Sequence, residues 1–217
     1  MSLKAAIIPV TPFQQNCTLI WNDETMHGAV SDPGGDIDRI LEAAEEMGVT
    51  IDKILLTHGH LDHAAAAGDL AKRLGVKIEG PHKDDLFLIE GLPEQAERFG
   101  FGAKTGSYLP DRWLEEGDTV EVAGLTFEVH HCPGHTPGHV IFFSKEAKLA
   151  IVGDVIFQGS IGRTDLPRGN HEQLISSIRE RLWPLGDDVT FVPGHGPLST
   201  IGAERQTNPF VADMNFG

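Results

Sequence analysis

The sequence has few of the features that several classes of protein need. It contains only two cysteines, Cys17 and Cys132, which cannot form a disulfide framework, and we expect both to be small buried side chains. It has no apolar run near the roughly 20 residues of a membrane-spanning helix. The apolar run at residues 5–10 is too short for a secretory signal and has no cleavage context. We therefore expect a cytoplasmic protein with no membrane partner.

Positive charge is also scarce. Lysine and arginine total 17 residues against 32 aspartates and glutamates, so the formal net charge is −15. A broad nucleic-acid-binding surface needs clustered basic residues to displace counterions, and this balance argues against one. An anionic small molecule is still compatible with the sequence, because salt screens distant charges and one local cation can outweigh them. The 40% hydrophobic content is typical of a globular protein, and the length suits one domain over residues 1–217.

Short β-prone runs alternate with helical stretches along the chain. We expect strands over residues 4–10, 17–21, 28–31, 51–57, 119–122, 125–131, 140–143, 149–152 and 189–192. We expect helices over 37–47, 62–74 and 171–183, and a pair of helical segments in 81–108 with breaks at 91–93 and 100–102. The strands flanking Ala123-Gly124 should form a hairpin. This order predicts an α/β (α+β) sandwich with helices outside two sheets.

Four of the expected strands lead into side chains that can bind metal ions. These side chains are His58, His60, Asp62, His63, His135, Asp154 and His195. Residues at the ends of neighbouring strands can converge on one rim, where loops carry functional groups on a rigid scaffold. The shared placement therefore predicts one site built from distant parts of the chain.

The spacing within the first group suits two neighbouring ions. His58 and His60 are two residues apart, so on an extended loop their rings face the same way and can share one ion. Gly59 between them leaves the backbone free to bend. Asp62 and His63 begin a helix and point elsewhere, which suits a second ion.

Imidazole and carboxylate are typical zinc ligands, and the same groups can hold iron or manganese. We assign His58, His60 and His135 to a first ion, Asp62, His63 and His195 to a second, and Asp154 as a bridge between the two. A carboxylate can bridge because it has two oxygens. Two adjacent cations lower the pKa of a shared water, so that hydroxide exists near neutral pH. We therefore expect two divalent metal ions as cofactors, zinc first.

The segment from Thr57 to His63, with the three later ligands, resembles the metallo-β-lactamase superfamily over nearly the whole chain. The resemblance implies a four-layer αββα sandwich with the metals at one edge. Within the superfamily the sequence is most similar to glyoxalase II-like hydrolases, also called hydroxyacylglutathione hydrolases. The motifs that carry this similarity lie at residues 13–17, 132–139, 162–165 and 193–197. Many β-lactamases of this fold differ, because they have a cysteine where Asp154 stands.

This resemblance implies hydrolysis of a thioester, such as S-lactoylglutathione, by a metal-bound hydroxide that Asp62 helps to orient. Only 22 residues follow His195, so the C-terminal helical domain that grips glutathione in larger relatives has no counterpart in this sequence. Arg163 stands where the family often presents a basic residue to a glutathione carboxylate. Asp165 stands in place of an aromatic residue and would repel that carboxylate. Arg163 is therefore predicted either to bind substrate or to pair with Asp165.

Other functions fit parts of the pattern. A mononuclear iron persulfide dioxygenase keeps most of the metal positions and resembles this chain at residues 162–165. A phosphodiesterase or lactonase could use the same two ions. A purely structural metal is the weakest alternative, because structural sites are closed four-coordinate cages. The oligomeric state is open, with a monomer as the working expectation.

The remaining histidines and the large aromatic residues have simpler interpretations. We expect packing roles, or roles as outer hydrogen-bond partners, for His130, His131 and His139. We expect surface positions for His27, His82 and His171. We expect core positions for Trp21, Trp113 and Trp183, and a packing role for Phe157, with pocket lining as its alternative.

Overall fold

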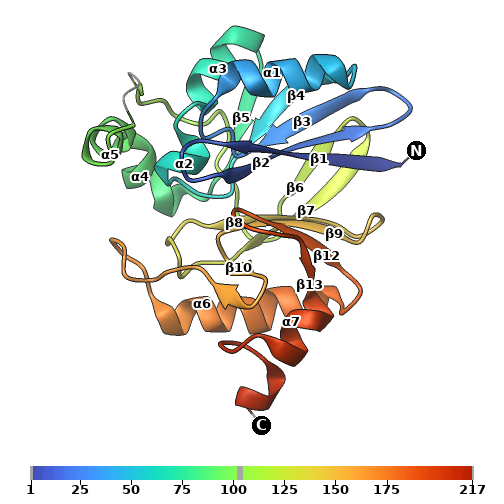
Figure 1. The fold of residues 1–217 in the computed structure, drawn as a ribbon, viewed down its shortest axis with the longest axis vertical. Coiled ribbons are helices and arrows are strands. Elements are labelled where there is room, and N and C mark those ends of the chain that lie inside the picture. Colours follow the sequence, from blue (N-terminus) through green and yellow to red (C-terminus); the bar gives the residue numbers. More distant parts are fainter. Residues whose placement is uncertain (1, 102–104, 217) are drawn as a thin grey trace.

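The computed structural model describes residues 2–101 and 105–216. Two β-sheets lie face to face, with helices over their outer surfaces (Figure 1). The first sheet contains, in spatial order, β1 (Leu3–Val10), β2 (Gln15–Asn22), β3 (His27–Ser31), β4 (Thr50–Leu55) and β5 (Lys77–Glu79). The second contains β13 (Ser199–Thr200), β12 (Thr190–Pro193), β9 (Leu149–Gly153), β8 (Val140–Ser144), β7 (Leu125–His131) and β6 (Thr119–Val122). A ribbon of β10 (Ile156–Phe157) and β11 (Ser160–Ile161) stands apart.

The helices fall on both outer surfaces and at one edge (Figure 1). They are α1 (Ile37–Glu46), α2 (Leu61–Ala64), α3 (Ala67–Leu74), α4 (Leu86–Glu90), α5 (Leu92–Arg98), α6 (His171–Ser177) and α7 (Ile201–Thr207). Shorter 3₁₀ turns are η1 (Lys83–Asp85), η3 (Trp183–Leu185) and η4 (Asp213–Asn215), and η2 (Ile178–Leu182) is a π-helical turn. Helices α1 and α3 cover the first sheet, and α6 and α7 cover the second (Figure 1).

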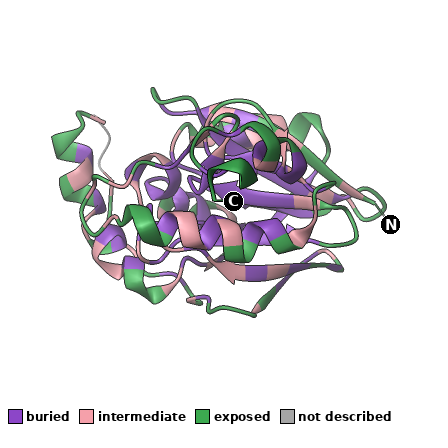
Figure 2. Ribbon diagram, turned by 90° about the horizontal axis from the view of Figure 1, so that it is seen from below, coloured by how far each residue is buried: buried purple, intermediate pink, exposed green. Residues whose placement is uncertain are grey.

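Three hydrophobic clusters separate these four layers. Because successive side chains of a strand point to opposite faces, Leu19 packs under α1 and α3 whereas Ile20 packs between the sheets. Phe142 likewise lies between the sheets, and its neighbours Ile141 and Phe143 pack toward α6. Figure 2 shows the outcome, with buried strands inside and exposed residues along the outer helices. The predicted αββα sandwich is confirmed.

The predicted hairpin is present as β6 and β7, which pair from Thr119 with Glu128 to Val122 with Leu125. Its two central residues both have positive φ, 50° at Ala123 and 81° at Gly124, as in the tight turns that match strand twist. Cys17 and Cys132 are buried and unpaired, as expected. Among the described residues, no helix is both long and apolar enough to cross a membrane.

The predicted single helix over residues 62–74 is wrong, because the chain forms α2 and α3 with a break between them. The backbone N–H of Ala66 donates to the carbonyl of Pro33 at 3.2 Å, outside the helix. The loop at Gly34 lies so close to α2 that a Cβ at position 34 would stand 1.5 Å from the backbone carbonyl oxygen of Asp62. Contact with this loop, which sequence periodicity does not report, therefore ends α2 after one turn.

One other helix prediction needed correction, and the two predicted breaks had different outcomes. The expected helix over 171–183 is regular only through Ser177, and continues as η2 and η3, where Pro184 has no N–H to extend the ladder. The break predicted at residues 91–93 is confirmed, since α4 ends before Gly91 and α5 carries a proline in its first turn. Of the predicted break at 100–102, Gly100 follows α5 with φ of 65°, and Gly102 lies outside the described residues.

Candidate metal centre

The predicted ligands meet because their strands end at one edge of the sandwich. β12 runs parallel to β9, and β8 runs antiparallel to both β9 and β7, so β7, β9 and β12 share one direction. The loop after β7 carries His135, Asp154 follows β9 directly, and His195 follows β12 after Gly194. The remaining ligands come from the other sheet, where the loop after β4 leads into α2. All seven predicted ligands are thereby brought together.

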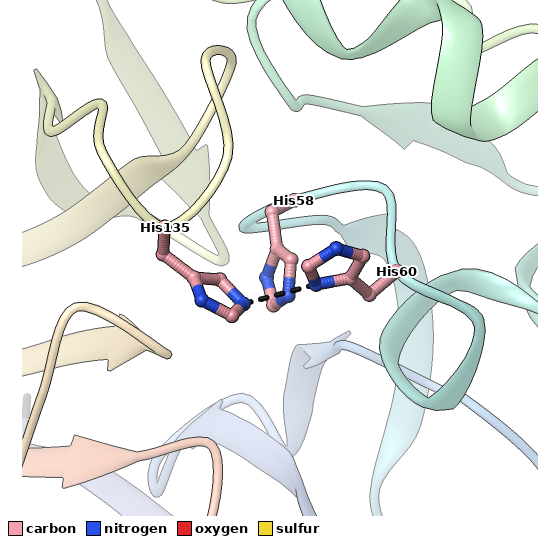
Figure 3. Close-up of side chains that lie close together, drawn as sticks. All are labelled: His58, His60 and His135. Atoms are coloured by element: carbon pink, nitrogen blue, oxygen red, sulfur yellow. Dashed lines mark hydrogen bonds between the residues drawn. The ribbon is translucent and has the colours of Figure 1, made fainter. Parts of the chain in front are cut away.

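The first triad, His58, His60 and His135, offers one nitrogen per ring, all within 4.8 Å of one another. His60 Nδ1 and His135 Nε2 are 2.9 Å apart (dashed line in Figure 3). Figure 3 shows the three rings turned toward one another from two loops. Two ligands of one tetrahedral zinc ion stand about 3.3 Å apart, given bonds of about 2.05 Å. The triad is close to that spacing.

The second triad is Asp62, His63 and His195, and it also offers one ligand atom per side chain, all within 4.8 Å of one another. His195 Nε2 is 3.0 Å from Asp62 Oδ2, and His63 Nε2 is 3.7 Å from the same oxygen. Asp154 stands between the triads: its Oδ1 is 3.3 Å from His63 Nε2, and its Oδ2 is 3.5 Å from His135 Nε2. The carboxylate therefore faces both triads, as the sequence predicted for a bridge.

Hydrogen bonds from behind fix which nitrogen of each ring faces the centre. His58 Nδ1 lies 3.0 Å from the Thr57 hydroxyl, and His63 Nδ1 lies 2.9 Å from the Asp32 carboxylate. His135 Nδ1 lies 2.7 Å from the Arg163 carbonyl, and His195 Nδ1 lies 3.3 Å from the Phe13 carbonyl. In each of these rings the outer contact leaves Nε2 directed inward, the arrangement that orients metal-bound histidines. His60 instead directs Nδ1 inward.

Three of the inward atoms are unsatisfied. His58 Nε2, His63 Nε2 and Asp154 Oδ1 are buried and have no hydrogen-bond partner among the described residues. A buried polar atom without a partner costs about 1–3 kcal/mol, and three in one cluster need an explanation. Cations between the triads would satisfy all three atoms, and the donor set of imidazoles and carboxylates suits zinc or iron. The residues therefore fit a dinuclear metal centre.

The two triads differ in charge. Burial lowers the pKa of His60 to about 3 and also lowers the pKa of His58 and His135, so these rings are neutral and keep free lone pairs. Burial alone would lower the pKa of His63, but the carboxylates of Asp154 and Asp62 raise it well above its usual value. The first triad is thus neutral, whereas at the second triad the carboxylates of Asp62 and Asp154 favour a cation, either a proton on His63 or a metal ion.

Asp32 is a supporting residue that the sequence analysis missed. It is buried and accepts hydrogen bonds from the Thr57 N–H at 2.7 Å and the Thr57 hydroxyl at 2.6 Å, and it contacts His63 Nδ1. It therefore links the ligand loop after β4 to α2. Asp32 directly follows β3, so the same strand-end rule that indicated the other ligands would have found it.

Asp85, the last residue of η1, is a second supporting residue that was missed. Its side chain is fully buried and accepts hydrogen bonds from the Gly59 N–H (2.9 Å), the Thr136 hydroxyl (2.8 Å) and the Gly138 N–H (2.6 Å). Burial raises the pKa of Asp85 to about 6, while these three donors oppose the rise. One carboxylate therefore fastens the His58–Gly59–His60 loop to the loop that carries His135. No local sequence pattern indicates this role.

Five of the seven predicted ligands, His60, Asp62, His135, Asp154 and His195, form the floor of a cavity of about 470 Å³. Its other lining residues are Phe13, Leu61, Gln95, Phe99, Phe157, Ser160, Ile161, Arg163 and Leu166. Arg163 reaches this pocket, but its guanidinium forms a two-point ion pair with Asp165 at 2.7 and 2.8 Å. Phe157 lines the pocket too, which is the alternative to packing that the sequence left open.

The other histidines occupy supporting or surface positions. His139 stacks on His58 with ring centroids 4.5 Å apart, and its Nε2 accepts the backbone N–H of Asp154 at 3.0 Å, which confirms the predicted supporting role. His27 and His171 are exposed as expected, but His82 is only partly exposed and stacks on His131 at 4.2 Å. Trp183 is buried, and Trp21 and Trp113 pack against the core of the first sheet.

Comparisons with known proteins agree with this geometry. The sequence pattern of the family described as the metallo-beta-lactamase superfamily matches residues 10–195. The chain is 53% identical to hydroxyacylglutathione hydrolase GloC of Haemophilus influenzae, over 94% of this chain and 96% of that protein. Among solved structures, the B3 metallo-beta-lactamase BLEG-1 has a TM-score of 0.87 and 34% identity, covering 96% of this chain and 99% of that one. TTHA1623 in a di-iron-bound form has a TM-score of 0.83 and 37% identity, covering 95% and 100%.

Proposed function

The chain belongs to the metallo-beta-lactamase superfamily and is a metal-dependent hydrolase, and from this premise we propose that it cleaves glutathione thioesters at a dinuclear metal centre. The observation that carries the proposal is the cluster of seven histidine and aspartate side chains with three unsatisfied inward atoms. The similarity to the Haemophilus hydroxyacylglutathione hydrolase supports the choice of substrate.

The proposed ligand sets are those of the two triads. His58, His60 and His135 would hold one ion, Asp62, His63 and His195 would hold the other, and Asp154 would contact both. Zinc is the proposed metal, and iron is the alternative that the di-iron form of TTHA1623 supports. Imidazole and carboxylate ligands bind either metal, so availability would decide between them.

Two bound cations would supply Lewis acidity, polarising the thioester carbonyl and lowering the pKa of a shared water. Asp62 lines the pocket beside His195, where its carboxylate can accept a hydrogen bond from that water and orient it toward the carbonyl carbon. Asp154 and Asp62 supply the negative charge that keeps the cations in place. The thiolate product leaves readily, because a free thiol has a pKa of about 8.5, so the reaction needs no nucleophilic serine or cysteine.

The test combines three measurements on purified enzyme loaded with one kind of metal ion, either zinc or iron. Metal analysis should give about two ions per chain, S-lactoylglutathione should release free glutathione, and glutathione persulfide should cause no oxygen uptake. One iron per chain with oxygen uptake on the persulfide would instead establish the dioxygenase alternative. Loss of thioester turnover on chelation and its return with added metal would show that the cations are required.

A β-lactam is a second candidate substrate, and one observation favours testing it. BLEG-1, described as a B3 metallo-beta-lactamase, matches nearly the whole chain at 34% identity. A chromogenic cephalosporin assayed beside S-lactoylglutathione on the same preparation would compare the two activities directly. The cytoplasmic location and the monomeric state stay predictions from the sequence.

A further inference from the structure

The two ends of the pocket differ in chemistry. At the second-triad end, the Phe13 carbonyl contacts His195 Nδ1 at 3.3 Å, and the Phe157 ring lies 6.3 Å from the His195 ring. At the first-triad end, the carbonyl of Arg163 contacts His135 Nδ1 at 2.7 Å. The Phe157 ring and the Phe13 backbone therefore adjoin His195, and the backbone of Arg163, the only lysine or arginine that lines the pocket among the described residues, adjoins His135.

We define the aromatic wall as Phe13, Phe99 and Phe157, which all line the pocket. Phe13 stacks on Phe101 with centroids 5.7 Å apart and meets Phe99 edge to face at 6.5 Å, so these rings support one another. Phe13 is nevertheless 48% exposed and Phe99 52% exposed. Large aromatic groups held at the mouth of a cavity, where water still reaches them, form a surface suited to an apolar ligand.

The charge at the other end decides how a glutathione thioester lies in the pocket. Both carboxylates of such a substrate are on its thiol portion, and the acyl portion carries none. The Arg163 guanidinium is paired with the Asp165 carboxylate, but this ion pair is exposed, so separating the two side chains costs little free energy. The thiol portion is therefore favoured at the Arg163 end, which leaves the acyl portion against the aromatic wall.

We propose that the aromatic wall binds the acyl group of the substrate and that the enzyme prefers apolar acyl groups larger than lactoyl. This inference rests on the proposed thioesterase function and specifies the substrate class. A lactoyl group is short and carries a hydroxyl, so it covers little of the wall. Burying one methylene contributes a factor of about two to four in binding, depending on how completely it is enclosed.

The experiment is a chain-length series. The specificity constant kcat/KM is measured for S-acetyl-, S-butanoyl-, S-hexanoyl- and S-lactoylglutathione with wild-type enzyme and with Phe13→Ala and Phe99→Ala. We expect kcat/KM of the wild type to rise about two- to fourfold per methylene, with hexanoyl above lactoyl. The variants should lose at least half of that slope on a logarithmic scale. A slope is unaffected by the fraction of active enzyme, so partial misfolding does not imitate the result.

Phe210→Ala is the matched control, because Phe210 is similarly exposed, at 46%, and does not line the pocket. Its chain-length slope should equal that of the wild type. A second readout is calorimetric binding of S-hexylglutathione and S-methylglutathione, which the enzyme does not hydrolyse. The hexyl compound should bind more tightly than the methyl compound to the wild type and to Phe210→Ala, and this difference should shrink in Phe13→Ala and Phe99→Ala.

The outcomes separate the two claims. A flat or falling series in an enzyme that hydrolyses S-lactoylglutathione would overturn the acyl preference and leave the proposed function standing. An unchanged slope in both Phe13→Ala and Phe99→Ala would overturn the role of the wall. No turnover of any thioester by metal-loaded enzyme would overturn the proposed function, and this inference would fall with it.

Discussion

The inner and outer halves of the pocket are built differently. In the inner half, His58 and His63 have no exposed surface, and Asp32 and Asp85 hold the backbone and rings from behind. In the outer half, Phe13 is about half exposed and the side chain of Arg163 is 62% exposed. Buried carboxylates fix the inner half through hydrogen bonds, whereas the Phe13 ring is held by ring contacts and the Arg163 guanidinium by one surface ion pair.

This difference indicates which part of the function can vary easily. Moving an inner residue leaves buried polar atoms without a hydrogen-bond partner, and each such atom destabilises the folded protein by about 1–3 kcal/mol. Exchanging an outer residue exposes or covers apolar surface without that cost. We therefore expect the hydrolytic chemistry to depend on the floor and substrate choice to depend on the exposed residues at the rim.

The largest effect is expected for Asp154→Asn, in the floor itself. The amide has one neutral oxygen and an NH₂ group, so it cannot face both triads with negative charge. We expect the bound metal to fall below two ions per chain and kcat/KM to fall by about a thousandfold or more, since such cations contribute several kcal/mol. Asp188→Asn, an exposed carboxylate paired with Lys148, is the control and should match the wild type in both measurements. Full metal content and turnover in Asp154→Asn would contradict the bridging role.

Gly194→Ala tests how tightly the floor is packed. A Cβ at Gly194 would lie 2.0 Å from Asp154 Oδ1 and 2.6 Å from His63 Cε1, so both side chains must shift. Misplacing catalytic groups by about 1 Å costs on the order of a hundredfold in rate, and we expect a loss of that size in kcat. Gly106→Ala places its Cβ in open space and should leave kcat unchanged. Equal activities in the two variants would show that Asp154 and His63 can move to make room for the new methyl group without loss of catalysis.

Asp85→Asn tests support from behind the ligands. The new NH₂ group must face at least one of the three donors that now bond to Asp85, which loosens the two ligand loops. We expect metal affinity to drop about 10- to 100-fold, as is usual when an outer partner of metal ligands is lost. The measurement is competition against a chromophoric chelator. Its neighbour Asp84 has a mostly exposed carboxylate, and Asp84→Asn should keep wild-type affinity. If Asp85→Asn and Asp84→Asn bind metal with equal affinity, Asp85 does not support the metal ligands.

The smallest effect is expected in the outer half, at Arg163. Exposed ion pairs contribute about 0.2–1 kcal/mol, so Arg163→Ala should raise KM for a glutathione thioester by no more than about fivefold, with kcat unchanged. Asp165→Asn frees the guanidinium and should lower KM for the same substrate. If Arg163→Ala instead reduced kcat by a hundredfold, the rim would share in the chemistry and the contrast between the two halves would fail.

The clustering of the proposed ligands could be predicted from the sequence because the signal is local and repeated. His58, His60, Asp62 and His63 form one short motif, and His135, Asp154 and His195 each follow an apolar strand-like run. The hairpin at Ala123-Gly124 was predictable for a similar reason, since the turn residues stand between two alternating strands. Local chemistry and strand period are sufficient for such features.

The rest depends on contacts between distant segments. Asp85 is 26 residues from Gly59 and 53 from Gly138, and neither separation has a sequence signature. The break between α2 and α3 depends on the approach of Pro33 to Ala66. Strands β10, β11 and β13 have two residues each, too short for a periodic pattern. The aromatic wall joins Phe13, Phe99 and Phe157 from three loops or element ends, so it appears only once the chain is folded.

The most direct test of the metal centre is anomalous X-ray diffraction, at the absorption edge of the bound metal, from crystals of zinc- or iron-loaded protein. We predict two anomalous peaks, one among His58, His60 and His135 and one among Asp62, His63 and His195, with Asp154 in contact with both. A single peak in one triad would contradict the dinuclear assignment. No peak in either triad, from crystals saturated with metal, would contradict the metal centre itself.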